Sequence, residues 1–230
     1  QLNAELTDRT LHNLNYAWVL GNEGYSNEYC YVVNIGAPNI EYTWSFQDNN
    51  VWYNNIDRGD DIFEVSMVLY HLEKAGDWID ELGKMQWPVS DEVIIDAHAG
   101  WPNPSDTGAW TFLPENEIWF GVAGVDAAED ACIIWHEFGH KVSFGLHPTR
   151  SNLSLYSLPT ASVLEGFSDY FACSYKKTIT GWDPHTIAEW GMAEYYLVHP
   201  ERRRRTDTEN KYPDDYSTNS HLNGQIYSSA

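Results

Sequence analysis

Apolar residues recur along this chain with two different spacings, and each spacing predicts a kind of secondary structure. Up to about residue 55, short apolar and aromatic runs are separated by Gly, Asn and Pro, which is typical of strands. These runs cover residues 16–20, 29–33 and 40–46. Asn and Asp are then frequent between positions 48 and 61, where the sequence predicts a loop.

Helical spacing begins after this loop. Within residues 62–83 the apolar positions repeat with a helical period, and a glycine closes the segment as a C-cap. Further helices are predicted over residues 126–145 and 161–177, the former with acidic residues near its positive N-terminal end, and residues 186–198 are also helix-like. The apolar positions of the first helix are Val65, Val68, Leu69, Leu72, Trp78 and Leu82, its closing glycine is Gly83, and the acidic residues of the second are Asp126, Glu129 and Asp130.

The segments between these helices predict further strands. Residues 93–97 form a short apolar run typical of a buried strand, and residues 109–112 and 117–121 predict a hairpin. No internal repeat or low-complexity linker divides the sequence. We therefore expect one α+β domain over residues 1–230. A β-rich lobe with the second predicted helix covers about residues 1–145, and a helical lobe begins at about residue 146.

Composition and charge narrow the functional classes. Of the 230 residues, 43% are hydrophobic and 15% are aromatic, so a packed core is expected rather than disorder. The formal net charge of −21 argues against nucleic acid or an anionic membrane surface as a partner, because both attract concentrated Lys and Arg. No apolar stretch is long enough to predict a membrane span. The only basic run, Arg202–Arg205, is expected to pair with local carboxylates.

The second predicted helix contains the pattern His136-Glu137-Phe138-Gly139-His140. Histidines four residues apart lie on one face of a helix, where His136 and His140 can bind one Zn²⁺. Glu137 between them can act on a zinc-bound water. The alternative is a chance match on a helix with two surface histidines, and the five residues alone do not decide between these interpretations.

The third predicted helix supplies the observation that favours the metal. Glu165 and Asp169 are spaced by four, and an antiparallel packing of the two helices brings both carboxylates beside the histidines. Glu165 is then the third zinc ligand, and Asp169 accepts the other ring N–H of His136. The alternative is a solvated acidic face. The apolar residues around the two carboxylates argue against it, because buried carboxylates need a partner. These are Leu164, Phe167, Tyr170 and Phe171.

Cys132 and Cys173 share the faces that carry these groups, so the same packing brings them together. Helix axes usually lie about 8–10 Å apart, which is wide for a disulfide. We expect packed thiols, with a bridge as the alternative.

The paired motifs HEFGH and EGFSDYFA resemble those of the gluzincin metallopeptidases, the thermolysin-like and fungalysin-like group, and they look closest to bacterial fungalysin-like proteins. The resemblance covers about residues 60–230. It implies a thermolysin-like zincin catalytic domain in which His136, His140 and Glu165 bind Zn²⁺ and Glu137 is the general base. Asp169 would support His136 from outside the ligand set.

The resemblance also implies roles around the metal. His221 would stabilise the oxyanion, with Asp214 or Asp215 orienting it, and Tyr156 is a weaker candidate for a second oxyanion donor. Ala109 and Trp110 resemble the edge strand that pairs with substrate. Gly108 stands where the family often has an asparagine, so one side-chain contact to substrate is absent.

These expectations describe a secreted zinc endopeptidase that hydrolyses peptide bonds in proteins or peptides through a zinc-bound water activated by Glu137. The alternative is a catalytically inactive zinc-binding fragment or structural component, because the sequence ends at Ala230 where relatives continue with a helical lobe. The remainder of the same chain is then an expected partner. Ca²⁺ is a second candidate ion at residues 57–61 and 126–130, although solvated or helix-capping carboxylates are favoured there.

Overall fold

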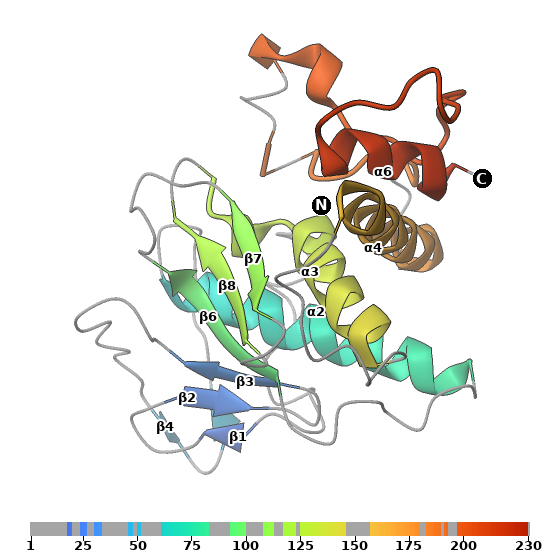
Figure 1. Cartoon of the computed structure of the whole chain (residues 1–230). Coiled ribbons are helices and arrows are strands. Elements are labelled where there is room, and N and C mark those ends of the chain that lie inside the picture. Colours follow the sequence, from blue (N-terminus) through green and yellow to red (C-terminus); the bar gives the residue numbers. More distant parts are fainter. Residues whose placement is uncertain are drawn as a thin grey trace.

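The fold combines one twisted sheet with several helices, in agreement with the α+β composition predicted from the sequence (Figure 1). The computed structural model describes residues 18–19, 24–26, 30–33, 46–47, 50–51, 61–82, 93–99, 108–112, 117–122, 125–145, 157–179, 183–189, 191–192 and 197–229.

Six strands form the main sheet in the order β1-β2-β3-β6-β8-β7. Strands β3, β6 and β8 are parallel, and the other neighbouring pairs are antiparallel. A separate hairpin pairs β4 with β5. The bounds are β1 Trp18–Val19, β2 Gly24–Ser26, β3 Cys30–Val33, β4 Phe46–Gln47, β5 Asn50–Val51, β6 Val93–Ala99, β7 Ala109–Phe112 and β8 Glu117–Gly121.

The predicted buried strand and hairpin are confirmed as β6 and the β7–β8 pair. In β7–β8, Ala109 is opposite Phe120 and Phe112 is opposite Glu117. Strand β7 lies at the end of the described strand order, so one of its edges faces no other described strand.

Helix α2 (Asp61–Glu81) lies in the connection between the parallel strands β3 and β6 and packs against both of them. The apolar positions at 65, 68, 69 and 72 are all buried, as their spacing predicts. Leu82 is an exception, because it lies just beyond the helix and is 51% exposed. The proposed C-cap Gly83 lies outside the described residues.

His71 of α2 is fully buried against the next helix. Its ring contacts Trp135 edge-on, and its carbonyl accepts a hydrogen bond of 3.3 Å from the Trp135 indole N–H. Neither ring nitrogen of His71 has a hydrogen-bond partner among the described residues. Burial therefore lowers the pKa of His71 from 6.5 to about 3.

This lowered pKa predicts a loss of stability in acid. Between pH 6.5 and about 3 the unfolded chain binds a proton at His71 that the folded chain does not, so the free energy of unfolding falls as pH falls. The slope is about 1.4 kcal/mol per pH unit in this window. We expect His71→Phe to flatten this dependence, measured by urea unfolding at several pH values from about 4 to about 7.5, which cover most of this window and the plateau above it. Equal pH slopes in both proteins would contradict the prediction.

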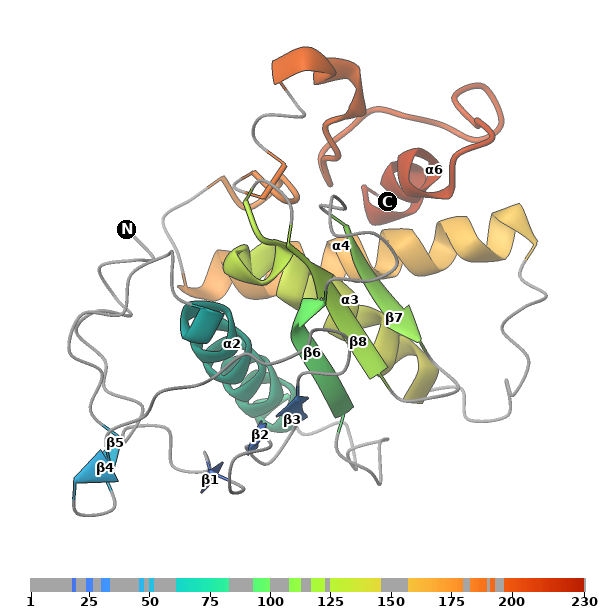
Figure 2. The ribbon, with the colours of Figure 1, turned by 90° about the vertical axis from the view of Figure 1, so that its left-hand side faces the viewer.

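Helices α3 (Ala131–Gly145), α4 (Leu158–Ile179) and α6 (Ser220–Ser228) continue outward from the sheet. Helix α3 packs against α2, and against β7 at its other side, while α4 packs on α3 and α6 covers α4 (Figures 1 and 2). A 3-10 turn, η2 (Ala127–Glu129), precedes α3, and Asp130 caps α3 by accepting the Cys132 N–H at 2.8 Å. The helix predicted over residues 126–145 therefore begins later than expected, at Ala131. Of its three acidic residues, Asp130 is the N-cap, whereas Asp126 makes no side-chain capping hydrogen bond.

Two glycines allow α4 and α6 to approach closely. A Cβ at Gly166 of α4 would lie 2.6 Å from the carbonyl oxygen of Gly224 and 2.8 Å from Tyr227 Cβ. A Cβ at Gly224 would meet backbone and side-chain atoms of α4 only at 3.0–3.3 Å. Helix α6, which carries His221, is therefore positioned by this contact.

We expect Gly166→Ala to destabilise the protein by about 1–3 kcal/mol, the usual range for overpacking, despite the better helix propensity of alanine. Gly224→Ala should cost less, because its contacts are longer. Urea unfolding of the two variants measures both effects. An alanine at 166 that is neutral while one at 224 is costly would contradict the close approach.

Further expectations differ from the structure. The start of the helix predicted over residues 186–198 is not helical: Thr186 makes a β-bridge with Arg205, and Ala188 has a φ of 53°, which interrupts a right-handed helix. Leu197 and Val198 at its end are helical, and residues 190 and 193–196 lie outside the described residues. The predicted loop after residue 47 contains strand β5. The third helix begins three residues earlier than expected, at Leu158. Most of the predicted strand over residues 40–46 lies outside the described residues.

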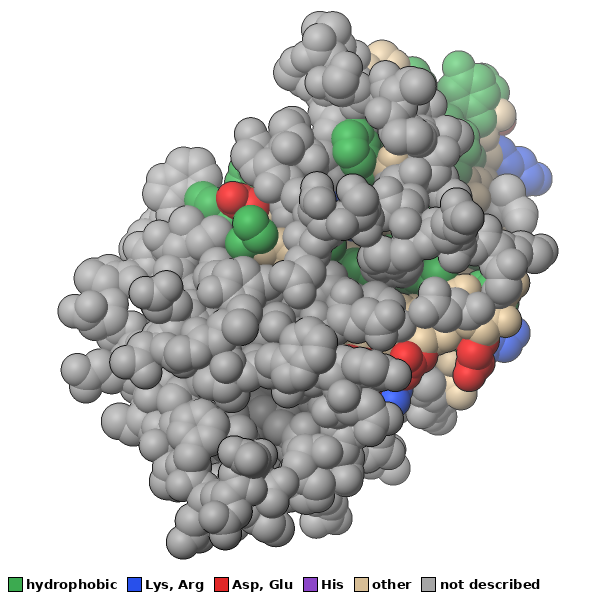
Figure 3. Space-filling view, turned by 90° about the horizontal axis from the view of Figure 1, so that it is seen from below, with side chains coloured by type: hydrophobic (Ala, Val, Ile, Leu, Met, Phe, Trp, Pro, Cys, Tyr) green, Lys and Arg blue, Asp and Glu red, His purple; other side chains and the backbone are tan. Residues whose placement is uncertain are grey.

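No described helix is long and apolar enough to cross a membrane. The face shown in Figure 3 carries acidic and basic side chains next to one another, with no basic cluster among the residues drawn in colour. Arginines of the 202–205 run pair with carboxylates, as predicted: Arg202 with Glu201, Arg204 with Glu165 and Asp169, and Arg205 with Asp183 and Asp207.

Candidate metal centre

Three side chains converge where α3 packs against α4. His136 Nε2 lies 3.2 Å from His140 Nε2 and 3.2 Å from Glu165 Oε2, and His140 Nε2 lies 3.8 Å from Glu165 Oε1. A tetrahedral Zn²⁺ with ligands at about 2.0–2.1 Å separates its donors by about 3.3 Å. The three donors therefore fit one small divalent cation, as their spacing in the sequence predicts.

Asp169 lies behind His136, on the side away from the other two donors. Its Oδ1 is 2.8 Å from His136 Nδ1, and the carboxylate is almost fully buried. An acceptor at Nδ1 leaves Nε2 directed at the convergence point. The structure thus brings Asp169 to the position that the four-residue spacing predicts.

The same carboxylates control the proton on His136. Burial and the charge of Arg204 lower its pKa, but Asp169 and Glu165 outweigh them and raise it to about 9. His140 has fewer such contacts, and burial lowers its pKa. Burial alone would raise the pKa of Glu165. The hydrogen bond from His136 and the charges of His140 and His221 outweigh burial and lower this pKa well below its usual range. The site is thus a compact set of one anionic and two nitrogen donors.

Glu137 lies on the side of the site that faces the sheet, where it contacts β7. The Thr111 hydroxyl of β7 donates to Glu137 Oε2 at 2.6 Å, and the same hydroxyl lies 3.1 Å from the Glu137 carbonyl oxygen. Thr111 therefore connects the edge strand to α3 and fixes the Glu137 carboxylate. Because the carboxylate is buried, this hydrogen bond is only weakly opposed by water and restricts the orientation of the carboxylate.

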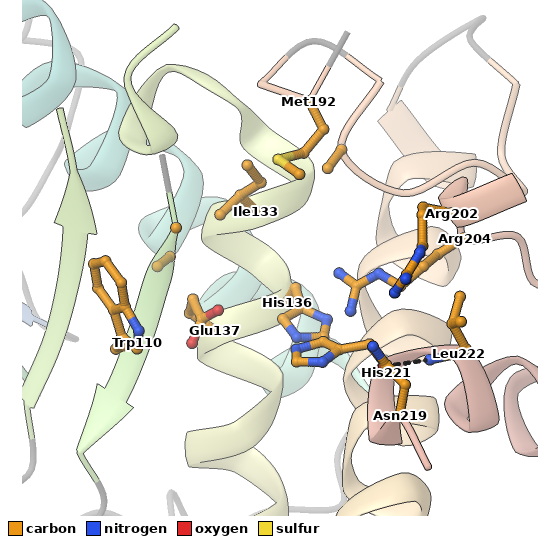
Figure 4. A pocket seen from close by; sticks show the side chains of 13 residues that line it. Trp110, Ile133, His136, Glu137, Met192, Arg202, Arg204, Asn219, His221 and Leu222 are labelled. Carbon is orange, nitrogen blue, oxygen red and sulfur yellow. Dashed lines mark hydrogen bonds between the residues drawn. The ribbon is translucent and has the colours of Figure 1, made fainter. Parts of the chain in front are cut away.

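A pocket of about 420 Å³ is lined by His136, one of the three donors, and by Glu137. Figure 4 shows Trp110 of β7 on one wall, Glu137 and His136 at the centre, and His221 with the arginines on the opposite wall. Ala109 also lines the pocket, so both predicted substrate-binding residues face it. Its other lining residues are Gly108, Ile133, Ala188, Met192, Arg202, Arg204, Asn219 and Leu222.

His221 lies in the first turn of α6, whose N-cap Asn219 accepts the Leu222 N–H at 3.1 Å. Its Nε2 is 3.4 Å from Glu165 Oε2, and its side chain is 56% exposed. The structure thus brings His221 to the edge of the metal site. It does not bring the proposed orienting residue there: Asp215 is exposed and accepts the Lys211 N–H at 2.8 Å, and Asp214 is also exposed. Tyr156 lies outside the described residues.

Two residues of this site were not expected from the sequence. Arg204 places one guanidinium nitrogen 3.5 Å from Glu165 Oε2 and the other 3.5 Å from Asp169 Oδ1. Thr111 contacts Glu137 as described above. Arg204 could have been suspected as a member of the only basic run, whereas a threonine in a strand gives no such signal.

Cys132 and Cys173 are buried free thiols, as expected. Burial raises the pKa of both. They lie on the continuation of the two helix faces and are not among the metal donors.

No protein family, curated protein or solved structure matches this chain.

Proposed function

We propose that this chain is a zinc-dependent endopeptidase of the gluzincin type, with a thermolysin-like catalytic domain. One observation carries the proposal: three nitrogen and oxygen donors stand at tetrahedral spacing beside a buried glutamate that faces a pocket. When bound, the ion would polarise a carbonyl and lower the pKa of water. Metal binding, proton transfer and stabilisation of negative charge on the substrate are assigned to side chains of this protein.

His136, His140 and Glu165 would hold the ion, with Asp169 fixing the tautomer of His136. Glu137 takes a proton from the attacking water and then donates it to the leaving amine. The Thr111 hydroxyl keeps the carboxylate oriented for both transfers. His221 and Arg204 supply positive or hydrogen-bonding groups on the opposite wall, where negative charge develops on the substrate oxygen.

The edge strand provides a way to bind the substrate. Strand β7 lies at the end of the described sheet, and Ala109 and Trp110 line the pocket. An extended peptide can therefore add alongside β7 through main-chain hydrogen bonds. This mode requires an unfolded or flexible segment, so the proposed substrates are flexible regions of proteins and peptides.

Removal of the metal tests this proposal. The protein is dialysed against 1,10-phenanthroline, and cleavage of an unfolded casein-type substrate is followed before and after zinc is restored. We expect cleavage to disappear with the metal and to return when zinc is supplied in proportion to the protein. Cleavage that survives complete metal removal would reject a metallopeptidase.

A further inference from the structure

A second group of metal-ligating side chains lies outside the site described above. Glu64 in the first turn of α2, His98 near the end of β6 and Asp126 just before η2 each place one donor atom within 4.8 Å of the others. None of the three belongs to the His136 site. They come from three elements that are far apart in the sequence, so the fold itself brings them together.

The buried carboxylate of Glu64 points to a ligand. Glu64 is only 2% exposed, and its Oε2 has no hydrogen-bond partner among the described residues. A buried carboxylate oxygen without a partner costs roughly several kcal/mol of desolvation unless a proton or a cation compensates it. Asp126 adds a second carboxylate beside it, and burial with this neighbour raises the pKa of Glu64 to about 9.

An irregularity in the backbone of β6 directs the His98 side chain towards Asp126. The pairing of β6 with β8 shifts register between Asp96 and Ala99, and the Asp96 carboxylate accepts the His98 N–H at 3.1 Å. Such irregularities redirect a side chain out of the regular alternation of a strand. His98 Nδ1 consequently lies 3.7 Å from Asp126 Oδ2.

We propose that Glu64, His98 and Asp126 form a second, structural cation site for a first-row divalent metal, with Zn²⁺ as the probe. Two carboxylates balance the charge of a divalent ion, and an imidazole donor favours a first-row transition metal over Ca²⁺ or Mg²⁺. The ion would join the start of α2, the end of β6 and the segment that leads into α3. It would therefore stabilise the support of the first metal site without taking part in its chemistry.

The competing explanation is a shared proton between Glu64 and Asp126. The two explanations differ in what binds. A cation site takes up metal and gains stability from it, whereas a proton-sharing pair takes up none. Asparagine has nearly the same shape as aspartate, so Asp126→Asn keeps the shape of the site and removes one negative charge.

The test measures zinc per chain by mass spectrometry after equilibrium dialysis, for the wild type and for Asp126→Asn, each with and without His140→Gln. We expect Asp126→Asn to remove one equivalent of zinc in both backgrounds. Zinc should also raise the melting temperature of His140→Gln but raise it much less in the double variant. The His140→Gln background separates this site from the proposed catalytic one.

His98→Gln is the second variant and should lose the same equivalent if Asp126→Asn fails to fold. Circular dichroism monitors folding of every variant. Unchanged zinc content in folded Asp126→Asn and in folded His98→Gln would overturn the proposal. Loss of all bound zinc in the single variant His140→Gln would also overturn it.

Discussion

Replacing Glu137 with glutamine is expected to reduce kcat/KM for peptide hydrolysis by about 10²–10⁴-fold, the usual contribution of a general acid–base residue. Glutamine preserves the shape of the side chain but cannot take a proton from water at neutral pH. Zinc content should be unchanged, because Glu137 is not one of the three donors. The measurement combines kcat/KM on a fluorogenic peptide with zinc content of the same preparation.

Glu81→Gln is the matched control, since Glu81 is an exposed residue at the end of α2 and the chemical change is the same. It should retain wild-type activity. A wild type that binds zinc yet cleaves no faster than Glu137→Gln would reject the peptidase function. That result would instead favour a zinc-binding component without catalytic activity.

The hydrogen bond between Thr111 and residue 137 is expected to survive in Glu137→Gln. A glutamine amide at position 137 can still accept the Thr111 hydroxyl through its carbonyl oxygen, so the link between β7 and α3 survives. Lost activity in Glu137→Gln would then reflect lost proton transfer rather than a displaced edge strand.

The sequence predicts the centre of this site well because the relevant signals are local. His136 and His140 share a helix face through their four-residue spacing, and Glu165 and Asp169 do the same one helix later. Antiparallel packing of these two helices then allows few pairings between their side chains. The 2.8 Å contact between Asp169 and His136 is the expected pairing. The hairpin of β7 and β8 was equally readable from alternation and turn residues.

The outer part of the site depends on long-range packing and was not predictable in this way. Arg204 reaches Glu165 because the chain turns at Ala188, whose positive φ ends the expected helix, and pairs at the Thr186–Arg205 bridge. Helix α6 was not predicted because its short sequence has few apolar residues, and its packing relies on Gly166 of α4. Its Asn219 N-cap was the one local signal.

Asp169→Asn and Glu165→Gln should both weaken zinc binding, but to different extents. Asn at position 169 no longer offers a full negative charge to His136 Nδ1, and loss of such an outer contact typically costs about 10–100-fold in metal affinity. Gln at position 165 removes the only anionic donor of the three, so the loss should be larger. Competition with a chromophoric chelator measures both dissociation constants, and Asp207→Asn, an exposed carboxylate paired with Arg205, is the control.

Proton release separates an orienting role of Asp169 from a merely structural one. In the zinc-free protein the pKa of His136 is about 9, so at pH 7.5 His136 carries a proton that zinc must displace. Loss of the Asp169 charge lowers this pKa, and fewer protons should be released when zinc binds to Asp169→Asn. Calorimetry in buffers of different ionisation enthalpy counts these protons. A folded Asp169→Asn that binds zinc as tightly as the wild type and releases as many protons would show that Asp169 does not act through His136.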